Sequence, residues 1–75
     1  MNTLKFEPLA SKLSFDQDNL HVHLKDGRAI SVPLAYFPRL MSASMRERKK
    51  YIISGGGRGL HWESLNEDIS VPALL

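Results

Sequence analysis

The feature that most constrains the fold is an alternation of apolar and polar residues on both sides of one turn. Apolar residues recur at every second position before and after Asp26-Gly27: Leu20, Val22 and Leu24, then Ile30 and Val32. A period of two is typical of β-strands, whose successive side chains point to opposite faces of a sheet. Asp-Gly between two such runs is a β-hairpin signal. We therefore predict two antiparallel strands joined at this turn.

The register of the hairpin follows from keeping the apolar residues on one face. A two-residue loop would place Ile30 opposite His23, on the polar face. A three-residue loop, Lys25-Asp26-Gly27, instead pairs Leu24 with Arg28, Val22 with Ile30, and Leu20 with Val32. A slip of one residue would turn a whole apolar set toward water. We therefore predict a type I turn followed by a bulge, with Gly27 in the left-handed conformation.

The flanking segments predict one more strand and two short helices. Leu13 and Phe15 share a parity and precede a turn at 16–19, so they indicate a first strand. Pro33 and Pro38 end strand character and open helical turns, with Phe37, Leu40 and Met41 on one helix face. Ser44 and Glu47 fit a capping box, which predicts a helix from Met45 to about Ile52.

The C-terminal third predicts a break, a short strand and a last helical turn. Gly55-Gly56-Gly57 must end the preceding helix. Residues 59–62 have the character of a short strand. Ser70 is a candidate N-cap for a final turn over residues 71–75, with Pro72 tolerated in that turn. The sum is one α+β domain over residues 1–75. We expect an antiparallel sheet of three N-terminal strands plus a short later strand, covered on one face by one or two short helices.

Composition limits what the domain can contain. A chain of 75 residues buries only about 60% of the surface that its unfolded form exposes, so its core is small. Hydrophobic residues make up 43% and charged residues 24%, which is an ordinary globular balance. Cysteine is absent, which excludes disulfides, thiol nucleophiles and cysteine-ligated zinc.

The cellular setting is also an expectation from the sequence. Lys5 and Glu7 interrupt any apolar run at the N-terminus, and no apolar stretch approaches the ~20 residues of a membrane helix. We expect a cytoplasmic protein that does not contact a membrane. The net charge is +2, with basic residues gathered in 39–50 and acidic ones after residue 62. Such an arrangement favours pairing within or between molecules, or contact with an acidic partner.

Several short blocks resemble the bacterial family called domain of unknown function 2442. They are Asp26-Gly27-Arg28, Val32-Pro33-Leu34, Phe37-Pro38-Arg39-Leu40, Glu47-Arg48, Gly57 with Gly59, Leu60-His61-Trp62, and Leu65-Asn66-Glu67-Asp68-Ile69-Ser70-Val71. The resemblance runs from about residue 13 to 75. Asn66 replaces the family's first acidic residue in the last block, which weakens any acidic-cluster or metal interpretation. The resemblance implies an antitoxin-like member of a two-protein bacterial system, without an established activity.

Few residues suggest chemistry. His61 with Glu67 and Asp68, beside Trp62, is the best candidate for an acid–base group or a partial metal site. The simpler interpretation makes Trp62 a core anchor and pairs the acidic residues with Arg39 or Arg48. His21 and His23 share a strand face but lack further metal ligands. The glycine-rich run at 55–59 lacks the Gly-Lys-Ser/Thr ending of a phosphate loop. We expect no enzyme activity, metal or cofactor.

Two functional hypotheses remain. The first is a protein-interaction module that binds a protein partner, with aromatic and arginine anchors at Tyr36, Arg39, Arg48 and Tyr51. The second is a nucleic-acid-binding regulator that uses the basic helix predicted at 45–52, with phosphate contacts from Arg46, Lys49 and Lys50. Self-association is a further expectation, because so small a core gains from burying an edge strand or exposed aromatics.

Overall fold

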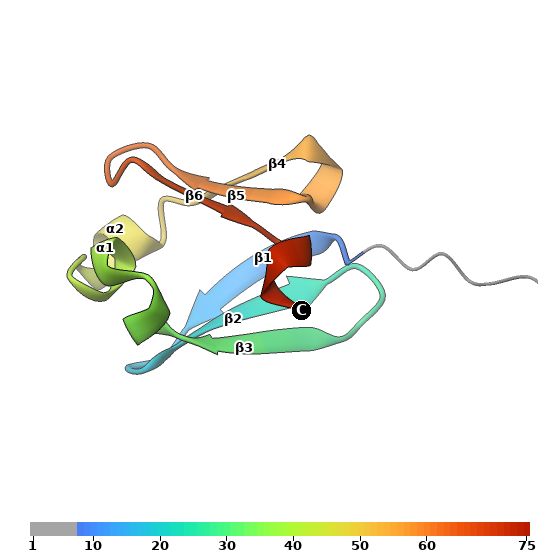
Figure 1. Ribbon diagram of the computed structural model, residues 1–75, viewed down its shortest axis with the longest axis horizontal. Coiled ribbons are helices and arrows are strands. Elements are labelled where there is room, and N and C mark those ends of the chain that lie inside the picture. The colour runs from blue at the N-terminus through green and yellow to red at the C-terminus, as the bar shows by residue number, and fades with distance from the viewer. Residues whose placement is uncertain (1–7) are drawn as a thin grey trace, which may run out of the picture.

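The computed structural model describes residues 8–75, which form two three-stranded antiparallel sheets and several short helical segments (Figure 1). Lys5 and Glu7 lie outside the described residues. The first sheet has the strand order β1-β2-β3 and consists of β1 (Ala10–Phe15), β2 (Asn19–Leu24) and β3 (Ala29–Pro33). The second has the order β4-β5-β6 and consists of β4 (Ile52–Ser54), β5 (Gly59–Trp62) and β6 (Glu67–Ser70). The helical segments are η1 (Leu34–Tyr36), α1 (Pro38–Met41), α2 (Met45–Arg48), η2 (Gly55–Gly57) and η3 (Pro72–Leu74).

The hairpin between β2 and β3 has the predicted register. Leu20 lies opposite Val32, and Val22 lies opposite Ile30. The backbone N–H of Leu24 donates to the carbonyl of Arg28 at 2.7 Å, which closes the three-residue loop. Gly27 has a φ of 97°, a value that side chains disfavour. The apolar face of the hairpin is therefore directed to the interior, as the alternation required.

The later strands form a sheet of their own, so the prediction that one short strand joins the N-terminal sheet was wrong. β5 pairs with β4 on one side and with β6 on the other. The partner strands were missed because residues 52–54 adjoin the predicted helix and residues 67–70 are acidic and short. Both segments place an apolar residue opposite Leu60: Ile53 from β4 and Ile69 from β6.

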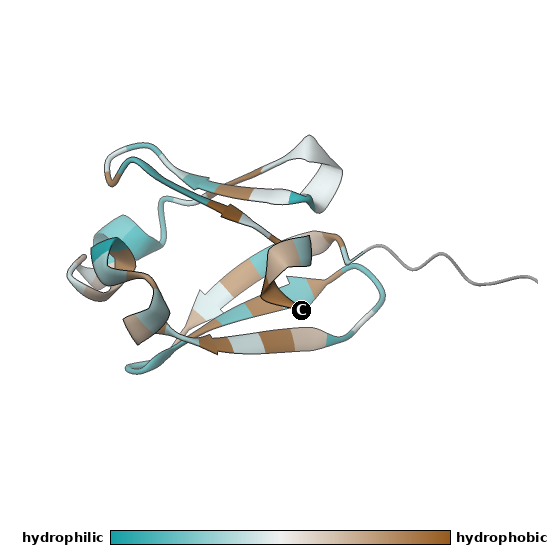
Figure 2. Cartoon of the chain, viewed as in Figure 1, coloured by the Kyte–Doolittle hydropathy of each residue, from teal (hydrophilic) through white to brown (hydrophobic). Residues whose placement is uncertain are grey.

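The two sheets form two layers with the core between them, and α1 and α2 lie at one end (Figure 1). We had expected the helices to cover one face of the first sheet. The second sheet covers that face instead. Apolar bands alternate with polar ones along the strands of the first sheet (Figure 2). The buried cluster draws on both sheets and on the connecting helical segments: Ala10, Leu13, Leu20, Val22, Leu24, Leu34, Leu40, Leu60, Trp62, Ile69 and Val71.

The starts predicted for the first two helices were confirmed, but the end predicted for the second was wrong. Ser44 and Glu47 form the predicted capping box of α2. However, α2 ends at Arg48, and the β-branched residues Ile52 and Ile53 enter β4 instead. The glycine run consequently joins two strands, not a helix to a strand. Pro38 opens α1 as expected.

The last helical turn is present as η3, but it does not start at the predicted N-cap. Ser70 lies in β6 and caps no helix, because the residue before η3 is the buried Val71.

Leu40 is fully buried in α1, while Met41 of the same helix remains 47% exposed, so the two do not share one buried face. None of the helices between residues 8 and 75 has the length and apolar character that crossing a membrane requires.

Candidate interaction surface

The candidate acid–base group around His61 is only partly assembled. His61 and Asp68 lie opposite each other on β5 and β6, and His61 Nδ1 is 2.6 Å from Asp68 Oδ1. Glu67 points to the other face of β6, because successive strand residues alternate. Asp68 is 75% exposed, so this pair lies on an open sheet face. Such an arrangement fits a cross-strand hydrogen bond that orders the outer surface.

Trp62 takes the structural role that the simpler interpretation assigned to it. Its side chain is 1% exposed, and its Nε1–H donates to the carbonyl of Arg48 at 2.9 Å. This contact joins β5 to the end of α2. The expected pairing of the acidic residues with Arg39 or Arg48 is not among the ion pairs of the described residues. Arg39 Nη1 instead donates to the carbonyl of Asn66 at 2.6 Å.

Two of the four predicted partner anchors, Arg48 and Tyr51, are half-buried and bonded within the chain. Arg48 is half-buried, and its guanidinium donates to the carbonyls of Leu40 and Met41 at 2.8 and 2.9 Å, at the end of α1. Tyr51 is also half-buried, and its hydroxyl accepts from the N–H of Leu13 at 3.2 Å. These groups link the helices and β1 to the segment before β4. Their role in binding a partner stays a prediction.

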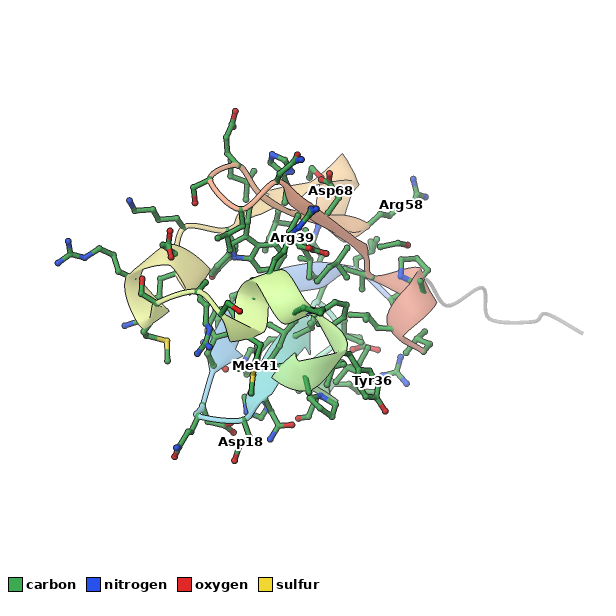
Figure 3. The ribbon with its side chains drawn as sticks, turned by 60° about the vertical axis from the view of Figure 1, so that its left-hand side comes forward. Asp18, Tyr36, Arg39, Met41, Arg58 and Asp68 are labelled. Carbon is green, nitrogen blue, oxygen red and sulfur yellow. The ribbon has the colours of Figure 1, made fainter. Side chains whose placement is uncertain are left out.

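The other two anchors remain at the surface. Tyr36, in η1, is 72% exposed. Arg39 is exposed on α1 (Figure 3). The basic side chains of the alternative hypothesis, Arg46, Lys49 and Lys50, are exposed as well. They lie in and just after a helix of four residues. This segment is shorter than the basic helix that the sequence predicted.

A groove that the sequence did not predict lies beside Tyr36. It has a volume of about 460 Å³ and runs between η1, η3 and β6. Apolar side chains make up most of its lining: Tyr36, Phe37, Ile69, Ala73 and Leu74, with Asp68 and Ser70 at the β6 side. Its existence depends on β6 being a strand next to η3, and the sequence did not predict that strand. The exposed aromatic at Tyr36 was the one sequence signal for this region.

The outer face of the first sheet carries a hydrogen-bonded polar network. His21 Nε2 lies 2.7 Å from Asp16 Oδ2, and His21 Nδ1 lies 2.7 Å from Ser31 Oγ. Ser14 Oγ lies 2.9 Å from His23 Nε2 on the same face. Asp16, His21 and Ser31 have the composition of a hydrolytic triad, which also requires donors for a developing oxyanion. Asp16 and Ser31 are exposed on an open surface, so the arrangement fits a surface hydrogen-bond network.

Asp16 is the titratable group that this network perturbs. The pKa of Asp16 is lowered from 3.8 to about 2, first by the hydrogen bond from His21 and then by the backbone N–H groups of Asp18 and Asn19, which donate to Oδ1. A carboxylate that accepts several hydrogen bonds favours its charged form. The network therefore stabilises the ionised aspartate at the turn between β1 and β2.

We expect Asp16→Asn to remove a pH-dependent contribution to stability. Because the folded pKa is below the unfolded one, this contribution is present above about pH 4 and is lost as the pH falls toward about 2. The difference in free energy of unfolding between wild type and Asp16→Asn should therefore shrink over that range. Urea unfolding at several pH values measures it. A difference that does not change with pH would contradict the assignment, and Asp18→Asn is the matched control.

Metal binding finds no support in the clustering of side chains. Within residues 8–75, no group of three or more His, Asp or Glu side chains is placed to hold a metal ion. His21 directs both ring nitrogens to other partners, Asp16 and Ser31. The Nε2 atom of His23 is engaged by Ser14. The described residues therefore do not present a donor set that fits a closed zinc site.

Comparison with known proteins agrees with the architecture and assigns no activity. Among curated proteins, no relative is similar enough to be matched. A crystal structure of a protein of unknown function from Rhodospirillum rubrum ATCC 11170 is 35% identical, with a TM-score of 0.78, over 92% of this chain and 86% of that one. Residues 10–75 match the family model described as "Protein of unknown function (DUF2442)". A match over nearly the whole chain shows that this protein belongs to the DUF2442 family.

Proposed function

We propose that the domain is a small protein-interaction module, the antitoxin-like member of a two-protein bacterial system. The observation that supports this most is the groove between η1, η3 and β6, with the 72% exposed ring of Tyr36 beside it. Exposed aromatic residues at the edge of an apolar depression are the usual anchors of protein interfaces. An open groove of this kind suits a macromolecular segment better than a small substrate, which needs deeper enclosure.

The antitoxin-like role is the finer part of the proposal. It draws on the family resemblance, and no side-chain cluster described above argues for a reaction instead. The cognate partner would then be a small protein whose activity the complex blocks. We also propose that the domain itself is not an enzyme and that it acts in the cytoplasm.

A nucleic-acid-binding role is the second candidate. Arg46, Lys49 and Lys50 are all exposed and close in sequence, so they can contact phosphates. If this role holds, wild-type protein should retard a random DNA duplex in a gel mobility assay at low salt, and the double variant Lys49→Glu, Lys50→Glu should not. If wild-type protein at micromolar concentration does not retard the duplex, the role is wrong.

Capture from the native cell tests the first candidate. The tagged full chain should co-purify with one dominant small protein in equal amount, and nuclease should not change this. Tyr36→Ala should weaken the complex by about thirtyfold, because truncation of an aromatic anchor costs about 2 kcal/mol. Expression of the captured protein alone should slow growth if the role is antitoxin-like.

The matched control is Ile52→Ala. Ile52 is 50% exposed on the outer face of the second sheet, away from η1. The proposal fails if both variants weaken the complex equally, or if nuclease removes every partner.

A further inference from the structure

The backbone of β6 offers hydrogen-bonding groups on the side away from β5. The N–H of Val71 donates to the carbonyl of Arg58 at 2.8 Å, and these two residues continue the β5–β6 register. In an antiparallel ladder, hydrogen-bonded pairs alternate with pairs whose backbone groups point outward. Counting back from Val71, residues 69 and 67 face β5, while Asp68 and Ser70 direct their N–H and C=O groups away from it. β6 is also the last strand of its sheet.

The apolar groove lies on this outward side of β6. Asp68, Ile69 and Ser70 form one of its walls, and η1 and η3 form the others. Phe37 and Leu74 are partly buried against the core, and Ile69 is 6% exposed. Tyr36 from η1 and Asp68 from β6 are both labelled in Figure 3. A chain laid along β6 would therefore meet backbone donors and acceptors on one side and apolar side chains beneath it.

The free edge of the first sheet differs in one respect. The Leu24–Arg28 and Leu34–Asp18 backbone bonds fix its parity in the same way, so Ala29, Ser31 and Pro33 of β3 face outward. Proline has no N–H, and proline at an outward edge position hinders the addition of another strand. β6 contains no proline, so its edge is the more receptive of these two.

Charge indicates what kind of chain can occupy the groove. Residues 59–75 contain three acidic side chains, Glu63, Glu67 and Asp68, and no lysine or arginine. Pairing of β6 with a second copy of itself would bring these acidic residues together, and like charges on adjacent strands are destabilising. A basic residue opposite Asp68 would instead be favourable, because opposite charges that face each other on adjacent strands attract, and the 75% exposed carboxylate of Asp68 is accessible to it.

The side-chain pattern of the occupant follows from the pleat. A residue opposite Asp68 projects to the outer face of the sheet, and its two neighbours project inward, toward Phe37 and Leu74. We propose that the groove binds an extended segment of a partner protein as a fourth strand beside β6. The segment carries lysine or arginine between two apolar residues. This inference rests on the proposed interaction function and adds the mode of binding.

A peptide selection tests the proposal even while the partner is unidentified. The probe is a phage-displayed library of random nine-residue peptides selected on the full chain, followed by synthesis of the enriched sequences. We expect an apolar–basic–apolar pattern. Binding should slow hydrogen exchange at the amides of Asp68 and Ser70, because these N–H groups gain acceptors.

Two proline variants form a matched pair of edge substitutions. Ser70→Pro removes an outward N–H of β6 and should weaken peptide binding by about tenfold, because one backbone hydrogen bond is lost and the ring also obstructs the edge. Ala29→Pro makes the same change at the free edge of β3 and should leave binding unchanged. Thermal unfolding of both variants confirms that each is folded.

A charge reversal gives a readout that does not depend on folding of the proline variant. Selection on Asp68→Lys should enrich glutamate or aspartate in place of the basic residue. The proposal is overturned if no peptide is enriched, if the enriched peptides lack the pattern, or if folded Ser70→Pro binds as well as wild type. A dimer in sedimentation that Ser70→Pro dissociates would show that a second copy occupies the edge instead.

The two proposals fail in different ways. A native partner that needs Tyr36 but not the β6 edge would leave the interaction function standing and overturn strand addition. Loss of all partners with nuclease would overturn the interaction function itself.

Discussion

Trp62→Ala should lower the free energy of unfolding by about 3–5 kcal/mol, the usual cost of removing a large aromatic side chain from a core. Domains of this size have about 5 kcal/mol of stability in total, so the variant should be largely unfolded well below the melting temperature of the wild type. Trp62 is 1% exposed and is the largest of the fully buried side chains. Its loss would leave a cavity between the two sheets and the helical end.

The hydrogen bond of Trp62 adds to this effect. The indole Nε1–H donates to the carbonyl of Arg48, the last residue of α2. Without the indole, that part-buried carbonyl loses its protein partner, which adds about 1 kcal/mol, the net worth of a typical hydrogen bond. Urea unfolding followed by far-UV circular dichroism measures the total, and the method does not depend on tryptophan fluorescence.

Trp62→Phe is the matched control. It keeps an aromatic ring but removes the Nε1–H donor and part of the volume. Its free energy of unfolding should therefore lie between those of the wild type and Trp62→Ala. A loss below about 1 kcal/mol for Trp62→Ala would show that the core does not depend on this side chain.

Gly57→Ala should be the second most disruptive substitution, at about 2–4 kcal/mol, because it combines backbone strain with a steric clash. Gly57 has a φ of 112°, a conformation that L side chains rarely adopt. A Cβ at this position would lie 2.8 Å from the carbonyl oxygen of Ala10 and 2.9 Å from its nitrogen. Both are backbone atoms, so they cannot move aside as the end of a flexible side chain can.

This close approach joins the two sheets. Gly57 is buried in η2, between β4 and β5, and the atoms that it meets belong to the start of β1. Gly56→Ala is the control, because Gly56 also has a positive φ, of 68°, but nothing lies within 4 Å of its added Cβ. The difference between the two variants in thermal or urea unfolding isolates the clash. Equal losses would mean that backbone strain accounts for the whole effect.

Local patterns predicted the parts of the fold that depend on neighbouring residues. The β2–β3 register could be predicted because an Asp-Gly turn and a period of two act over fewer than about fifteen residues. The capping box at Ser44 and Glu47 is likewise a contact three residues long. The core role of Trp62 could be predicted because its side chain is large and mostly apolar, and such side chains are usually buried.

The candidate site was less predictable. Tyr36 and Arg39 were proposed as exposed anchors, and their side chains are at the surface. The groove beside Tyr36 could not be inferred, because its walls come from η1, β6 and η3, and about thirty positions in the chain separate the first of these from the other two. The network of Asp16, His21 and Ser31 was missed for a related reason: cross-strand neighbours share no motif in the sequence.

The first hairpin, the starts of α1 and α2, and the α+β class follow from local sequence patterns: the period of apolar residues, a proline or a cap. The position of β4 and β6 on either side of β5 in a second sheet depends instead on packing between distant segments. Ile52 and Ile53 extend the pattern of a helix in sequence, but Ile53 is packed against the core opposite Leu60 as a strand. Burial of a shared apolar face outweighed local helix preference, and that choice also created the free edge of β6.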